Sequence, residues 1–168
     1  MFSQETEIQK YDVIKSIENI EIRYYPPSMK AKVSSNRNFS KLFQYISGNN
    51  DKKEKIAMTA PVYMTQENGK NTMEFVLPSK YSEKNAALPK DKSIELYSSK
   101  PGYYAAIIFG GYSNVDKVNL NYKILLEKIK ENNLSVVSKK PISLPYNSPY
   151  KVFNRRNEVL VEIEYSVK

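Results

Sequence analysis

The spacing of apolar residues predicts two helices in a chain whose other segments alternate like β-strands. Over residues 38–48 and again over residues 114–131, apolar side chains recur at intervals of three and four. In the first segment they are Phe39, Leu42, Phe43 and Ile46, and in the second Val115, Val118, Tyr122, Leu125 and Ile129. Each set forms one apolar stripe on a helix, so both helices are expected to pack on a sheet.

Residues at the ends of these segments fit the predicted helix termini. Asn38 is a suitable N-cap for the first helix, and Gly48 is suitable for the left-handed position after its end. Ser113 or Asn114 is expected to cap the second helix. Phe43 lies at the centre of the first apolar stripe, so we expect it in the core, with a cost of about 3–5 kcal/mol on truncation to alanine.

Elsewhere the apolar residues alternate with polar ones, which predicts strands with one buried face. The alternating sets are Ile20, Ile22 and Tyr24; Ile56, Met58, Ala60, Val62 and Met64; Met73, Phe75 and Leu77; and Val159, Val161, Ile163 and Tyr165. Residues 103–109 are apolar at both parities, which predicts a strand covered on both faces.

An internal repeat organises these elements. Residues 20–35 resemble residues 94–111, since each segment reads as a strand, a proline-containing turn and a second strand. Each is followed by a helix and two more strands, which gives two β-β-α-β-β halves at about 20–80 and 94–165. The polar segment 79–93 reads as the linker between them. We predict an α+β fold over residues 1–168, as a single domain with a pseudo-twofold axis.

Composition narrows the chemistry further. The chain has no cysteine and no histidine, so disulfides, thiolate catalysis and histidine-based zinc or haem ligation are all absent. The net charge is +8, but only four of the 26 basic residues are arginine and the lysines are scattered. This pattern favours a solvated lysine-rich surface over nucleic-acid binding. No apolar run approaches a membrane span and residues 1–7 lack the features of a signal peptide, so a soluble cytoplasmic protein is expected.

Several blocks of the sequence resemble the signatures of the SOUL/haem-binding-protein family. The blocks are IEIRYYP at 20–26, YISGNNDKKEKIAMTAPV at 45–62, EFVLP at 74–78, FGGY at 109–112 and YNSPYKVFNRRNEV at 146–159. They occur in order and span nearly the whole chain. The resemblance implies a distorted eight-stranded antiparallel β-barrel with two flanking helices, which the gyrase-inhibitor-like effector domains share. It also implies non-covalent binding of haem b or another tetrapyrrole, without catalysis, by a monomer.

The resemblance suggests two ways of holding haem. Where one relative uses a histidine, this sequence has Tyr24, whose phenolate is a possible ligand for ferric iron, with Tyr25 as the fallback. Tyr24 also shares the parity of Ile20 and Ile22, which favours packing in the core. The other mode needs no axial ligand and uses an apolar patch near the first helix, with basic residues at the propionates. The residues implied are Arg37, Lys41, Phe39, Leu42 and Met58, with Lys52, Lys53 and Lys55 nearby.

Four further possibilities stay open. Met58 and Met64 are candidate thioether ligands, although their parity favours core packing. Arg155 and Glu158 lie in a block that the family keeps, either as part of a ligand site or as an ion-pair network that holds the last strand. Glu74 or Glu158 is the central glutamate if the domain is instead a small-molecule effector or hydrolase domain, and a protein-interaction module is a third alternative.

Overall fold

The computed structural model describes residues 5–148 and 150–166, and the chain divides into two compact units. Unit 1 contains the described residues up to Gln9 and residues Pro27–Lys100, and unit 2 contains Lys10–Pro26 and the described residues from Pro101 onward. Each unit has one helix on a mainly antiparallel sheet, so the predicted α+β class with two helices is confirmed. Within the described part of the chain, neither helix is both long and apolar enough to cross a membrane.

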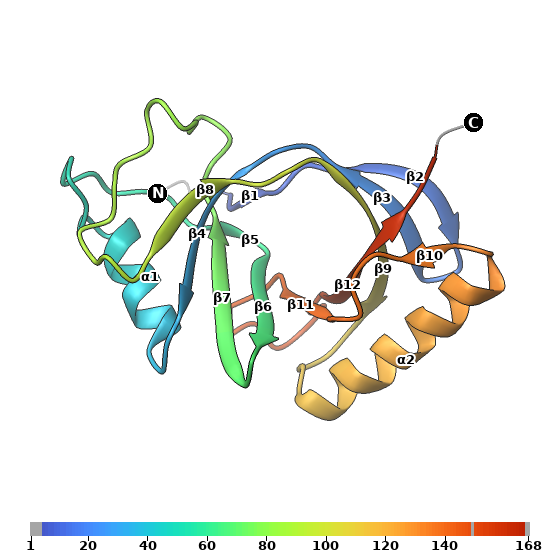
Figure 1. Ribbon diagram of the computed structural model, residues 1–168. Helices are drawn as coiled ribbons and strands as arrows, with labels where there is room; N and C mark the ends of the chain where they lie inside the picture. The colour runs from blue at the N-terminus through green and yellow to red at the C-terminus, as the bar shows by residue number, and fades with distance from the viewer. Residues whose placement is uncertain (1–4, 149, 167–168) are drawn as a thin grey trace. The chain divides into compact units, whose positions relative to one another are not determined.

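Unit 1 is a four-stranded antiparallel sheet with α1 (Asn38–Ile46) on one face (Figure 1). Its strand order is β6 (Val62–Glu67), β7 (Lys70–Val76), β4 (Met29–Ser34) and β8 (Glu95–Ser98). Asn68 and Gly69 both have positive φ and close the tight hairpin between β6 and β7. The short strands β1 (Glu7–Ile8) and β5 (Thr59–Ala60) pair in parallel beside this sheet. Every second residue of β4 enters the core beneath α1, as the period-two pattern predicts.

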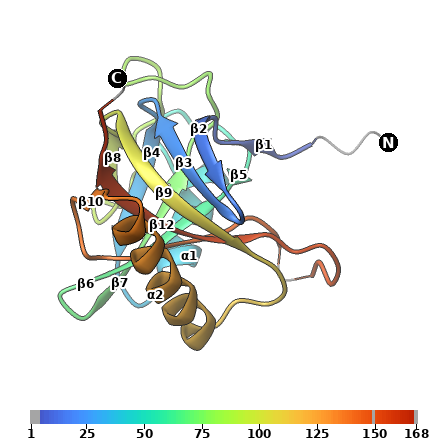
Figure 2. The ribbon, with the colours of Figure 1, turned by 90° about the vertical axis from the view of Figure 1, so that its right-hand side faces the viewer.

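Unit 2 is a larger sheet with α2 (Val115–Glu131) on one face. Its strand order is β2 (Asp12–Ile17), β3 (Ile20–Tyr25), β9 (Gly102–Phe109), β12 (Asn157–Glu164) and β11 (Ile142–Pro145), and β10 (Ser135–Val136) also pairs with β12. Figure 2 shows α2 alongside β9, β10 and β12. Ala105, Ala106 and Ile107 are all fully buried, so the centre of β9 is covered on both faces as predicted.

The two compact units do not coincide with the two sequence halves. The first half supplies β3, β4, α1, β5, β6 and β7, and the second supplies β8, β9, α2, β10, β11 and β12. However, β3 pairs with β9 in unit 2, and β8 pairs with β4 in unit 1. Each half therefore contributes its first strand to the sheet that the other half mainly builds. Superposition of segments 20–80 and 94–165 about a pseudo-twofold axis stays a prediction.

The predicted helix ends are partly confirmed. Asn114 caps α2 by accepting a hydrogen bond from the Lys117 backbone N–H, and Gly48 has φ +122° just beyond α1. The N-cap of α1 is Arg37 rather than Asn38. The Asn38 side chain instead accepts from the backbone N–H of Ser35 and donates to the Asn71 carbonyl. It joins the helix start to β7 instead of satisfying the helix's own N–H groups.

The prediction that Phe43 lies in the core is wrong. Phe43 is 48% exposed, and Phe39 is 53% exposed, whereas Leu42 is fully buried. The core side of α1 is formed by Leu42, Tyr45 and Ile46, whose positions lie on one face of the helix. Phe39 and Phe43 lie at the flank of that face, so the apolar stripe in the sequence is wider than the surface that the sheet covers.

We predict that the two kinds of apolar position on α1 differ in their effect on stability. Leu42→Ala should lower the free energy of unfolding by about 2–5 kcal/mol, because it leaves a cavity in a closed core. Phe43→Ala should lower it by about 1 kcal/mol, because half of that ring already faces water. Urea unfolding of both variants measures the difference, and equal costs would contradict the exposed position of Phe43.

Candidate functional site

A buried ion-pair cluster lies on the sheet face of unit 2 opposite α2. Arg23 on β3 and Glu158 on β12 are both fully buried and form a two-pronged pair, with N–O distances of 2.6 and 2.7 Å. Arg156 donates to the same carboxylate from Nε at 3.0 Å and from a terminal nitrogen at 2.7 Å. Glu21 accepts from Arg23 at 2.5 Å, so two arginines are balanced by two carboxylates.

Three tyrosines complete this cluster. The Tyr146 hydroxyl donates to Glu158 at 3.0 Å, and the Tyr25 hydroxyl accepts from Arg23 at 3.0 Å. Tyr11 accepts from Arg156 at 2.7 Å, and its ring lies 4.0 Å below the Arg23 guanidinium. Glu158 therefore accepts hydrogen bonds from three side chains, and none of its oxygen atoms is left for a ligand.

The electrostatics of the cluster keep its charges fixed. Burial alone would raise the pKa of Glu158, but the hydrogen bonds and charges of Arg23 and Arg156 outweigh burial and lower it. Burial and the charge of Glu158 raise the pKa of the Tyr146 phenol well above its ordinary value. The pKa of Tyr25 is also raised, mainly by burial, although the charge of Arg23 opposes that effect. At neutral pH the carboxylate is ionised and both phenols keep their protons.

Arg155 has a different role from its neighbour. It donates to the backbone carbonyls of Ser148 and Lys151 at 2.8 and 2.6 Å, and its guanidinium lies 4.2 Å from the Tyr112 ring centroid. Its Nε is buried and has no hydrogen-bond partner in the described part of the chain. Arg155 therefore holds the loop before β12, while Arg156 and Glu158 form the ion-pair network expected for this block.

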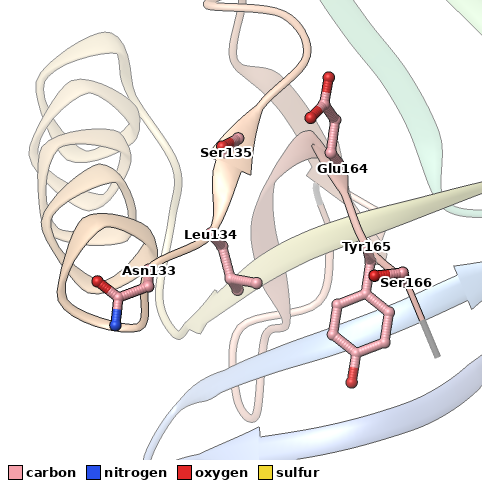
Figure 3. Close-up of a pocket in the computed structure, with 6 residues that line it drawn as sticks. All are labelled: Asn133, Leu134, Ser135, Glu164, Tyr165 and Ser166. Carbon is pink, nitrogen blue, oxygen red and sulfur yellow. The ribbon is translucent and has the colours of Figure 1, made fainter. Parts of the chain in front are cut away.

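Tyr24, the candidate iron ligand, belongs to a row of tyrosines on the α2 side of unit 2. Its ring centroid lies 5.3 Å from that of Tyr103, which lies 5.2 Å from Tyr165. Tyr165 lines an open cleft of about 430 Å³ together with Asn133, Leu134, Ser135, Glu164 and Ser166. Figure 3 shows the ring of Tyr165 and the side chain of Leu134 at this cleft. Tyr24 is partly buried and is not among the lining residues.

The flank of α1 carries the exposed aromatic surface of unit 1. The rings of Phe39 and Phe43 are stacked with centroids 5.8 Å apart and planes 15° apart. Phe39 also contacts the buried Phe75 edge-on, which anchors the pair to β7. The stacked pair leaves about half of each ring exposed, which gives the flank of α1 an apolar surface patch.

The basic residues expected beside this surface are not all near it. Lys41 donates to the Ser93 hydroxyl at 3.0 Å and lies 3.8 Å from the Asp91 carboxylate. At about 100° per residue, Lys41 lies about 160° around the helix from both Phe39 and Phe43. Arg37 is exposed at the helix N-terminus, and Leu42 lies beneath the helix in the core.

The remaining candidates are separate from both surfaces. Met58 and Met64 are 37% and 42% exposed, so their predicted core packing is wrong. Met58 lies outside the regular strands, since β5 begins at Thr59. It lines a cleft of about 420 Å³ with Pro78 and Lys80. Glu74 on β7 accepts a hydrogen bond from the Tyr97 hydroxyl. No group of three or more acidic side chains that could hold a metal ion occurs among the side chains that the structure describes.

Comparison with known proteins identifies the family. The sequence pattern of the SOUL heme-binding protein family matches residues 6–162. The chain belongs to the SOUL family. Heme-binding protein 2 from Homo sapiens is 30% identical over 154 residues, which cover 83% of this chain and 75% of that protein. Heme-binding protein 2 from Mus musculus is 26% identical, with the same coverage.

Solved structures share the fold of this SOUL-family chain at low sequence identity. A hydrolase from Listeria innocua matches with a TM-score of 0.61 and 9% identity, covering 90% of this chain and 94% of its own. The C-terminal domain of EcmrR matches with a TM-score of 0.60 and 12% identity, covering 93% and 99%. At these identities the likeness concerns the fold alone.

Two central residues of the structure were missed in the sequence. Arg23 alternates with Ile22 and Tyr24, a position where the strand pattern predicts solvent, yet it is fully buried, and Lys30 is also buried. Two sequence features point to a partner for Arg23. Glu21 lies in the same strand, and Glu158 occupies a polar position of the last strand. Recognising the pair required the order β3-β9-β12, which the sequence alone does not supply.

We predict that the ion-pair cluster of this SOUL-family protein stabilises it in a pH-dependent way. Glu158→Gln should lower the free energy of unfolding at pH 7 by about 3–5 kcal/mol, because the fully buried Arg23 and the partly buried Arg156 lose the carboxylate that they share. The folded-state pKa of Glu158 is lowered, so its contribution is complete above the unfolded-state pKa and is lost as pH falls through the folded value. Urea unfolding from pH 7 to pH 3 should show the two proteins converging at acidic pH.

A matched control for this experiment is Glu164→Gln, which changes an exposed carboxylate at the end of the same strand. It should leave stability within about 0.5 kcal/mol of the wild type. A Glu158 variant as stable as this control would show that the ion pair does not stabilise the fold.

Proposed function

We propose that this protein binds haem or a related tetrapyrrole reversibly, packing the face of the macrocycle on the Phe39–Phe43 surface, and that it does so without catalysis. The observation that carries the proposal is the half-exposed, nearly parallel ring pair in a member of a haem-binding family. A planar apolar ligand would cover rings that otherwise face water. The absence of cysteine rules out thioether attachment, so binding is non-covalent.

Iron ligation is a separate question from binding of the macrocycle. With no histidine in the chain, Tyr24 is the candidate ligand, and its ring is occupied by packing on Tyr103. To reach iron it would have to leave that contact. We therefore favour binding without an axial ligand from the protein, which relies on burial of the porphyrin face and gives micromolar rather than nanomolar affinity.

The test is titration of hemin into the protein, followed by the Soret band. The wild type should bind saturably with a dissociation constant on the order of micromolar, and Phe39→Ala/Phe43→Ala should weaken binding by about tenfold or more. Tyr24→Phe should leave the affinity unchanged. Lys41→Gln, on the opposite flank of the helix, is the matched surface control, because it places no second carboxylate beside Asp91, and it should also bind like the wild type.

Two results would change this interpretation. Loss of a phenolate-to-iron charge-transfer band in Tyr24→Phe, with weaker binding, would transfer the site to unit 2. Absence of saturable binding of hemin and of protoporphyrin at tens of micromolar would reject the tetrapyrrole proposal itself.

A further inference from the structure

Lys30 is a buried lysine on the face of the unit 1 sheet opposite α1. Its neighbours along β4, Met29 and Ala31, enter the core beneath the helix, so the Lys30 side chain points to the other face. Across the sheet it is paired with Val76 on β7 and with Tyr97 on β8. Lys30 is only 7% exposed, which is unusual for a lysine.

The ammonium group of Lys30 has an aromatic ring as its close partner. Nζ lies 3.5 Å from the centroid of the Tyr63 ring, and Tyr63 is held in place because its hydroxyl donates to Gln9 Oε1 at 2.6 Å. No hydrogen bond or salt bridge of Nζ occurs among the described residues, and the residue as a whole is 7% exposed. The amine is therefore sheltered but the residue is not fully enclosed.

The charged groups around Lys30 have opposite effects on its pKa. Burial lowers the pKa of Lys30 to about 8, the carboxylate of Glu74 on β7 raises it, and the ammonium of Lys32 on β4 lowers it further. Glu74 is itself engaged by the Tyr97 hydroxyl from β8. At pH 7.5 roughly a quarter of Lys30 is then a neutral amine, against about one part in a thousand for an ordinary lysine.

We propose that Lys30 is a nucleophilic lysine that condenses with a small aromatic aldehyde to form a Schiff base above the Tyr63 ring. The neutral amine attacks the carbonyl carbon, and the nitrogen transfers a proton to the carbonyl oxygen to give a carbinolamine. Loss of water, with a proton from solvent, leaves the protonated imine. Its positive charge takes the place of the ammonium over the ring, where the same cation–π attraction stabilises it. An aromatic aldehyde suits the site because Tyr63 and Tyr97 both lie on this face.

The test uses the full chain, benzaldehyde and cyanoborohydride, which reduces each imine to a stable secondary amine. Peptide mass spectrometry then gives the rate of modification at every lysine. At pH 7.5 Lys30 should be modified about tenfold faster than Lys32, and its rate should reach half of its maximum near pH 8. Lys30→Arg should remove the fast adduct, whereas Lys32→Arg and Tyr63→Phe, which keeps the ring, should retain it.

The mapping on the wild type decides the outcome even if a variant fails to fold. Modification of Lys30 no faster than that of Lys32 would overturn the proposal. The same reaction in 8 M urea is the control, because unfolding should abolish the difference between the two lysines. Haem binding is measured independently by the Soret titration, so either proposal can fail without the other.

Discussion

The Arg23–Glu158 ion pair joins two strands of the unit 2 sheet that are far apart in the sequence. β3 comes from the first half of the sequence and β12 from the second, and the two paired residues are 135 positions apart. β9 lies between these strands, so the pair ties an exchanged strand to the rest of the sheet. Burying one arginine alone would be very costly, but here two arginines and two carboxylates neutralise one another and satisfy each other's hydrogen bonds. The ion pair and the backbone pairing with β9 therefore both hold β3, a strand of the first sequence half, in the sheet of unit 2.

Period-two alternation predicted the helix-side core that β3 and β12 supply to unit 2, because apolar residues recur at every second position of these two strands. Ile20, Ile22, Val159, Val161 and Ile163 all pack in one cluster with Leu125 and Ile129 of α2. The same rule failed for the other face, where polar parity suggested solvent and the structure has buried charges. Alternation reports which residues share a face, but whether a polar face is solvated or paired depends on strands that are distant in the sequence. Local pattern therefore predicted the elements and the helix-side core, and long-range pairing decided the rest.

The helix α1 shows the same limit at shorter range. Its apolar stripe was read correctly as a helix, but a stripe does not show how much of its width the sheet will cover. α1 packs on β4 and β7, so the buried positions are those that face these two strands, and the flank with Phe39 and Phe43 extends beyond them. Tyr45 is fully buried in the core beneath α1, and its hydroxyl is satisfied there by donating to the Ala87 carbonyl at 2.6 Å. The difference between core and candidate ligand surface thus comes from packing geometry, not from residue type.

Some polar groups of this protein make all of their hydrogen bonds inside the fold, and these differ from groups that can still contact a ligand. Arg23 and Lys30 are both buried cations on the polar faces of sheets, but Arg23 donates to Glu21, Tyr25 and Glu158, whereas Lys30 rests on a single ring. Glu158 is likewise saturated by its donors, which makes it a poor central glutamate for an effector or hydrolase site. A group with all of its hydrogen bonds made inside the fold loses them if it turns to a ligand, so binding there is opposed by the stability of the protein. The half-exposed phenylalanine pair makes no hydrogen bonds, so contact with an apolar ligand there adds interactions without breaking any hydrogen bond.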